Sequence, residues 1–278
     1  MSACLINGEP GAAIEADDRG LAYGDGLFET IAWREGAARF LDLHWLRLTE
    51  SSVRLGLPIP PLDRLAAEIK SLAGATAEGT VKVIWTRGAG PRGYAPPRQP
   101  SPSRIVTFAP LEATNATVGE YSLRLLAAPA STHAGLAGIK SLNRLDNVLA
   151  RAELATRGGD EGIMLDAHGA LVGGTMSNLF VMVAGTLMTP DLVAAGVRGI
   201  MRSAVLREAR LLGLPAVETT LAASTLGRAD AAFVTNALIG IRPVSAIDDR
   251  RVASAAHPQV RAIMAAMLRR GVRECREF

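Results

Sequence analysis

Lys140 is the residue of this chain best placed to act as a nucleophile. Of the 30 basic residues only three are lysines, at positions 70, 82 and 140. Lys140 lies beside the apolar Ile139 and Leu142, and no acidic residue is within five positions of it. An apolar setting favours the neutral amine, which is the form that attacks a carbonyl to make a Schiff base. The context predicts a Schiff-base lysine, although a structural lysine fits the same surroundings equally well.

The other two lysines are in segments with regular periodicity. Lys70 fits the solvent face of an amphipathic helix over residues 61–74, so a surface charge is expected there. Lys82 is in TVKVIWTRG (80–88), where alternation places it on the same strand face as Ile84. For Lys82 a neutral and a functional role remain equally open.

Other chemical motifs are excluded by their context. Residues 88–93, GAGPRG, match GxGxxG, but a dinucleotide site needs a helix that begins there, and the prolines at 91, 96, 97 and 100 forbid one. Cys4 and Cys275 are at opposite ends of the chain, and the four histidines form no HxxH or HExxH cluster, so no metal site is expected.

The elements that must position Lys140 alternate irregularly, which predicts an α+β fold. Strands are expected over 27–33, 80–88, 103–110 and 121–129, and again in several short runs after residue 160. Helices are expected over 41–57, 61–74, 142–157 and 197–213, and from about residue 257. We expect a smaller N-terminal α/β domain over 1–125 and a larger, barrel-like α/β domain over 126–278 that carries Lys140.

Composition narrows the class of protein. The chain has 278 residues, 49% of them hydrophobic, and a formal net charge of +3. Its arginines are scattered and aromatic residues make up only 4%, so nucleic-acid binding is not expected. The N-terminus does not have the pattern of a signal peptide, and no apolar run approaches the roughly 20 residues that span a bilayer. A soluble, cytoplasmic protein is the expectation.

Six segments, in chain order, carry a resemblance to a known family. They are DDRGLAYGDGLFETI (17–31), LHWLRL (43–48), IKSLNRLDNVLARAEL (139–154), GTMSNLF (174–180), GVRGIMR (196–202) and TNALIGIRPV (235–244). With these segments the chain resembles the fold-type IV pyridoxal-phosphate enzymes. That family includes branched-chain aminotransferases, D-amino-acid aminotransferases and aminodeoxychorismate lyases.

The resemblance implies a cofactor and a set of site residues. Pyridoxal 5′-phosphate would form a Schiff base with Lys140, and Arg47 would bind its phosphate through the forked donors of a guanidinium. The other implied cofactor-binding residues are Gly173, Ser177, Asn178, Leu179, Ile200, Met201, Asn236 and Ala237. On the substrate side we expect Phe28, Arg87, Arg92 and Tyr94. The family also implies a homodimer.

Two segments point within the family to aminodeoxychorismate lyase. TRGAGPRGYAPP (86–97) resembles a loop of the lyases, and TNALIGIRPV (235–244) resembles their phosphate-side segment. The implied reaction converts 4-amino-4-deoxychorismate to 4-aminobenzoate and pyruvate in folate biosynthesis. A D-amino-acid or branched-chain aminotransferase, or a pyridoxal-phosphate-binding protein without catalysis, are the alternatives.

Gly173 departs from the family pattern. The family usually has a glutamate here, whose carboxylate keeps the pyridine nitrogen of the cofactor protonated. Without this carboxylate, the cofactor should stabilise a carbanion less well. A lyase tolerates this loss better than an aminotransferase does, because the product of the lyase is aromatic. We therefore expect Gly173→Glu to raise activity or cofactor affinity.

Overall fold

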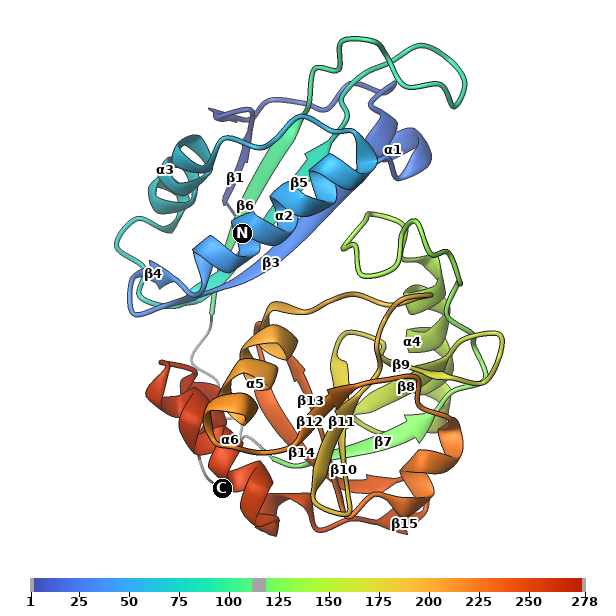
Figure 1. Ribbon diagram of the computed structural model, residues 1–278. Helices are drawn as coiled ribbons and strands as arrows, with labels where there is room; N and C mark the ends of the chain where they lie inside the picture. The colour runs from blue at the N-terminus through green and yellow to red at the C-terminus, as the bar shows by residue number, and fades with distance from the viewer. Residues whose placement is uncertain (1–2, 112–118, 277–278) are drawn as a thin grey trace. The chain divides into compact units, whose positions relative to one another are not determined.

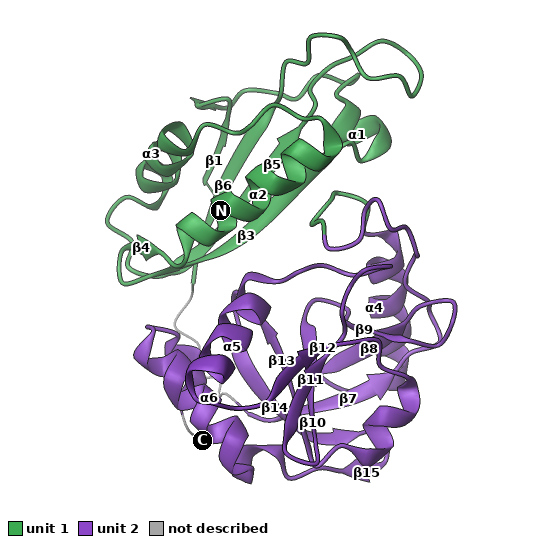
Figure 2. Cartoon of the chain, in the orientation of Figure 1, with its two compact units in different colours: residues 1–114, 139–143 green, residues 115–138, 144–278 purple. Residues whose placement is uncertain are grey.

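The computed structural model describes residues 3–111 and 119–276. Two compact units make up the chain (Figure 2): residues 1–114 with 139–143 form unit 1, and residues 115–138 with 144–278 form unit 2. This division differs from the expected 1–125 and 126–278 in two places. The strand at 121–125 hydrogen-bonds into the sheet of unit 2. The segment 139–143, with Lys140, pairs with a strand of unit 1, so Lys140 belongs to the first unit.

Unit 1 is a six-stranded sheet with helices on one face (Figure 1). The strand order is β2-β1-β6-β5-β3-β4. The strands are β1 (Ala3–Ile6), β2 (Glu9–Pro10), β3 (Gly26–Arg34), β4 (Ala37–Ala38), β5 (Gly79–Thr86) and β6 (Arg104–Pro110), and the helices are α1 (Arg19–Tyr23), α2 (Leu41–Leu55) and α3 (Leu62–Ala73).

The two faces of this sheet differ because side chains alternate along each strand. Ile31 of β3 and Val81 and Val83 of β5 are buried against Leu65 and Ile69 of α3. On the opposite face Phe28 and Thr30 are half-buried and Lys82 is exposed. The face not covered by α2 and α3 therefore carries Phe28, Thr30 and Lys82.

Unit 2 contains a mixed nine-stranded sheet and three α-helices. The strand order is β12-β11-β10-β13-β14-β7-β8-β9, with β15 paired to β14. The strands are β7 (Tyr121–Leu125), β8 (Glu161–Leu165), β9 (Leu171–Gly174), β10 (Asn178–Val183), β11 (Thr186–Thr189), β12 (Ala216–Glu218), β13 (Ala231–Asn236), β14 (Gly240–Ile247) and β15 (Arg250–Arg251). The helices are α4 (Leu145–Arg157), α5 (Ile200–Leu211) and α6 (Pro258–Arg269), with 3-10 turns η1 (Ala223–Arg228), η2 (Ser254–Ala256) and η3 (Arg273–Cys275).

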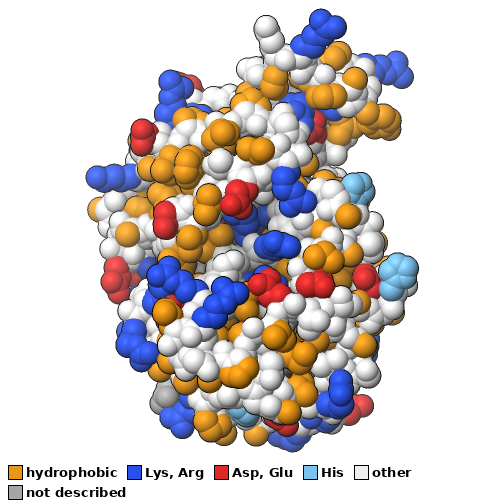
Figure 3. All heavy atoms as spheres, viewed as in Figure 1, with side chains coloured by type: hydrophobic (Ala, Val, Ile, Leu, Met, Phe, Trp, Pro, Cys, Tyr) orange, Lys and Arg blue, Asp and Glu red, His pale blue; other side chains and the backbone are white. Residues whose placement is uncertain are grey.

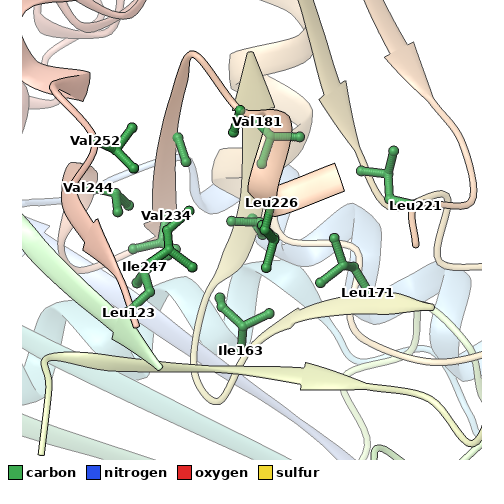
Figure 4. Close-up of a cluster of buried hydrophobic side chains, with 13 residues drawn as sticks. Leu123, Ile163, Leu171, Val181, Leu221, Leu226, Val234, Val244, Ile247 and Val252 are labelled. Carbon is green, nitrogen blue, oxygen red and sulfur yellow. The ribbon is translucent and has the colours of Figure 1, made fainter. Parts of the chain in front are cut away.

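The core of unit 2 is aliphatic (Figure 4). Leu123, Ile163 and Val234, which come from strands distant in the sequence, are fully buried in one cluster. Branched side chains on adjacent strands bury apolar area efficiently, at about 25 cal/mol per Å². This core fixes the strand ends from which the turns of the candidate site project.

The charged side chains on the described surface reflect the nearly balanced net charge of the sequence. On the face seen in Figure 3, basic, acidic and apolar side chains are interspersed. No helix in the described ranges has both the length and the apolar character needed to cross a membrane.

Candidate functional site

Lys140 is held beside β3 by backbone pairing within unit 1. The N–H of Phe28 donates to the carbonyl of Lys140 at 3.0 Å, and the N–H of Leu142 donates to Gly26 at 3.0 Å. Leu27 and Ser141 form an antiparallel bridge, so Lys140 lies opposite Phe28 and on the same face. The Lys140 Nζ is 4.0 Å from the centroid of the Phe28 ring. The structure thus brings a predicted catalytic residue and a predicted substrate-side residue together.

Arg47 lies in a buried charge cluster of the same unit. Its Nε donates to Glu29 Oε1 at 2.8 Å and its Nη2 donates to Glu29 Oε2. His44 Nδ1 is 2.6 Å from the same Oε2. A guanidinium bound along one edge by a carboxylate has its other edge held in a fixed direction. The role of Arg47 as a phosphate ligand stays a proposal, but its orientation is set by Glu29.

The Glu29 carboxyl is only 2% exposed and stays ionised. Burial by itself would raise its pKa, but the Arg47 guanidinium and the hydrogen bond with His44 outweigh burial and lower the pKa to about 2. Glu29 is therefore a permanent anion at neutral pH that supports Arg47. Glu29 is not among the residues predicted from the sequence.

Arg87 serves the fold of unit 1. Its guanidinium donates to Asp25 at 2.7 and 3.0 Å, and to the carbonyls of Leu55 and Gly56 at the end of α2, both at 2.8 Å. With Arg19, Arg87 lowers the pKa of Asp25 against the opposing effect of burial. Four donor contacts hold the guanidinium in place, and its predicted substrate role stays a prediction.

The proline-rich loop that carries Arg92 and Tyr94 is anchored by a buried arginine. Arg19 is 3% exposed, and its guanidinium donates to the carbonyls of Gly93, Tyr94 and Ala95 at 2.9, 2.8 and 3.3 Å. Arg92 is exposed, and Tyr94 is 86% exposed. As predicted, no helix begins in residues 88–93. The loop presents both side chains to solvent, and their substrate role remains a prediction.

In unit 2, Ile200 and Met201 open α5. No side chain caps this helix, and its first turn contains no acidic residue. The first backbone N–H groups of a helix lack partners within it and favour an anion such as a phosphate. Asn178 holds the backbone that leads into α5. Its Oδ1 accepts the Gly199 N–H at 3.1 Å and its Nδ2 donates to the carbonyl of Val197 at 2.8 Å.

Asn236 links a second turn to this region. Its Oδ1 accepts the N–H groups of Leu238 and Ile239 at 2.9 and 3.0 Å, which shapes the turn that contains Ala237. Its Nδ2 donates to the carbonyl of Met176 at 3.2 Å. This hydrogen bond joins Asn236 to the 174–178 turn, and the cofactor contacts that the resemblance implies for both stay a prediction. Leu179, by contrast, is fully buried in the core.

Glu161 organises the 174–177 turn and was missed in the sequence. Its side chain is 2% exposed and accepts hydrogen bonds from Thr175 Oγ1 at 2.5 Å and Ser177 Oγ at 2.8 Å, and from the N–H groups of Gly162, Thr175 and Met176. The only local signal is an acidic residue at the start of the apolar strand EGIML. A buried carboxylate with this many donors is a rigid anchor.

Gly173 adopts a backbone conformation that side chains disfavour. Its φ is +151°, and an added Cβ would lie 3.0 Å from the carbonyl oxygen of Ser177. A glutamate here would therefore strain the backbone. This strain opposes the gain in activity or cofactor affinity expected of Gly173→Glu, and the sequence alone did not reveal it. Whether that substitution raises activity stays a prediction.

No group of three or more metal-ligating side chains gathers in the part of the chain that the structure describes. Unit 1 supplies a lysine and an arginine supported by Glu29, and unit 2 supplies a helix N-terminus and polar turns.

Comparison with known proteins identifies the family. Residues 26–247 match the model of the family described as amino-transferase class IV. The chain belongs to this family, the fold-type IV enzymes, which bind pyridoxal 5′-phosphate. The predicted fold class and cofactor are confirmed.

Similar proteins have several activities. The solved structure of 4-amino-4-deoxychorismate lyase from Pseudomonas aeruginosa is 40% identical with a TM-score of 0.88, over 97% of this chain and 99% of that one. A putative branched-chain-amino-acid aminotransferase of Methanocaldococcus jannaschii is 30% identical over 87% of this chain and 85% of its own. D-alanine aminotransferase of Bacillus licheniformis is 27% identical over 88% and 86%. Each of these proteins is a relative in fold, and their activities differ.

Proposed function

We propose that the chain is a lyase that converts 4-amino-4-deoxychorismate to 4-aminobenzoate and pyruvate. The observation that carries the proposal is the likeness to the Pseudomonas aeruginosa lyase, at 40% identity over 97% of the chain. The loop TRGAGPRGYAPP and the segment TNALIGIRPV, which resemble the lyases, support it further. The branched-chain and D-alanine relatives, at 30% and 27% identity, keep aminotransfer as the second candidate.

The described residues fit pyridoxal 5′-phosphate. Lys140 offers an amine over an aromatic ring, and the uncapped start of α5 at Ile200 and Met201 offers backbone donors for a phosphate. Gly138 pairs with residues 196–198 just before α5, and it precedes Lys140 by two positions in the chain. When bound, the cofactor supplies an aldehyde for an amine and a conjugated ring that accepts electrons from the bond being broken.

The residues of the chain then have separate tasks. Lys140 would hold the cofactor through its amine and would take the proton from the ring carbon that bears the amine of the substrate. The carbon–oxygen bond to the three-carbon side chain breaks, and the leaving enol gains a proton to become pyruvate. The six-membered ring becomes aromatic, and no oxidant is consumed. Because aromatisation drives the step, Gly173 in place of a carboxylate is compatible with it.

The test compares products. The purified protein, loaded with cofactor, is incubated with aminodeoxychorismate made in place from chorismate by a partner synthase. We expect 4-aminobenzoate and pyruvate in equal amounts, and no amino transfer from D-alanine or leucine to 2-oxoglutarate. Amino transfer without 4-aminobenzoate would refute the lyase proposal in favour of the second candidate.

The proposal includes a homodimer in the cytoplasm and a role in folate synthesis. An apolar stripe on α4 supports self-association: Leu145, Val148 and Leu149 share one helix face at i, i+3 and i+4 and are 77%, 59% and 65% exposed. Neither Cys4 nor Cys275 forms a disulfide in the described structure, which suits a reducing compartment.

A further inference from the structure

Two of the three lysines of the chain converge on one aromatic ring. The Nζ of Lys140 is 4.0 Å from the centroid of the Phe28 ring, and the Nζ of Lys82 is 5.7 Å from the same centroid. The two ammonium groups are therefore less than about 10 Å apart, and both are within the range of a cation–π contact. Apart from Lys70, every other basic residue of the chain is an arginine.

The register of the sheet explains the convergence. Thr30 lies directly opposite Lys82, and Phe28 lies opposite Ile84. Lys82 is thus the diagonal neighbour of Phe28 across the β3–β5 pair, a separation that a long side chain spans. Lys140 lies opposite Phe28 on the other edge of β3. One face of the sheet therefore carries Lys82, Phe28 and Lys140 on three neighbouring segments.

The surroundings of Lys82 leave its charge without a protein counterion. Its cross-strand neighbours are Thr30 and Thr107, which are neutral, and Ile84 follows it on the same face. Within the described residues no carboxylate forms an ion pair with Lys82, which is exposed. An ammonium in this position attracts an anion from solution.

We propose that Lys82 binds a carboxylate of the substrate and so selects amines that carry an anionic group beyond the reacting centre. The inference rests on the proposed function, because Lys140 must be the residue at which the amine reacts. The apolar body of the ligand packs against Phe28, its amine faces Lys140, and its carboxylate faces Lys82. A lysine suits this task because its compact charge on a flexible stem follows carboxylates of different geometry.

The test uses two ligands that differ only in charge. Binding of 4-aminobenzoate and of 4-aminobenzamide to the cofactor-loaded protein is measured by calorimetry. We expect the wild type to prefer the acid, and Lys82→Met to reduce that preference about tenfold, since one charged contact is lost. Lys82→Arg should retain most of it. Lys70→Met, which removes the third lysine from α3, should match the wild type.

The preference should also weaken as salt is added, because the contact is exposed. An unchanged acid-to-amide ratio in Lys82→Met, or no preference in the wild type, would overturn the inference. The product assay separates this result from a failure of the proposed function. A wild type that makes 4-aminobenzoate but shows no effect of Lys82→Met refutes only the role of Lys82. A wild type that makes none refutes the lyase.

Discussion

Replacing Glu29 by glutamine should remove a defined part of the acid sensitivity of the protein. In the folded chain the pKa of Glu29 is about 2, against its ordinary value of 4.5. The folded state therefore binds fewer protons than the unfolded state over this range, and its stability falls as the pH falls. At ~1.4 kcal/mol for each pH unit that separates two pKa values, the carboxylate contributes about 3 kcal/mol at neutral pH. About 2 kcal/mol of this is lost between pH 5 and pH 3.

The assay is urea unfolding of wild type and Glu29→Gln at pH 5 and pH 3. Glu29→Gln should be less stable at pH 5, because Arg47 and His44 lose a charged partner. Its loss of stability on going to pH 3 should be smaller than that of the wild type by about 2 kcal/mol. Glu50→Gln removes an exposed carboxyl from α2, the helix that carries Arg47 and His44, and serves as the control. If wild type and Glu29→Gln lose equal free energy of unfolding between pH 5 and pH 3, the reasoning is refuted. If Glu50→Gln reduces this loss as much as Glu29→Gln does, the number of carboxyl groups sets the pH dependence, and not the environment of Glu29.

Two further substitutions test the turns of unit 2. Glu161→Gln should lower the free energy of unfolding by about 3 kcal/mol, because the amide cannot accept all the donors of Thr175 and its neighbours; urea unfolding checks this, and Asp249→Asn, at a fully exposed carboxyl, should have little effect. Gly173→Ala should cost about 1–2 kcal/mol through backbone strain beside Ser177. Thermal unfolding measures it, and an unchanged melting temperature would contradict the strain.

The local elements were predictable because local periodicity determines them. The apolar spacing over 41–57 placed α2. Helix α5 likewise follows from its repeat over 197–213.

Non-local pairing was not predictable from these patterns. The segment 139–143 pairs with β3 of unit 1 although its neighbours in the chain belong to unit 2, and no local period specifies such a partner. The contacts of Arg87 with Asp25 and with the end of α2 likewise join segments that are distant in the chain. Glu161 was missed because a buried carboxylate makes sense only when its donors are known. The family resemblance, by contrast, singled out Lys140 and the start of α5 from the sequence, and their roles toward the cofactor stay a prediction.

The most direct measurement of the central claim is the rate of 4-aminobenzoate formation by the cofactor-loaded wild type, Lys140→Ala and Lys70→Ala. We expect Lys140→Ala to lose at least about a thousandfold in rate, because the same amine would bind the cofactor and move the proton. Lys70→Ala, on the exposed face of α3, should keep the wild-type rate. A Lys140→Ala variant that forms 4-aminobenzoate at a rate near that of the wild type would contradict the account.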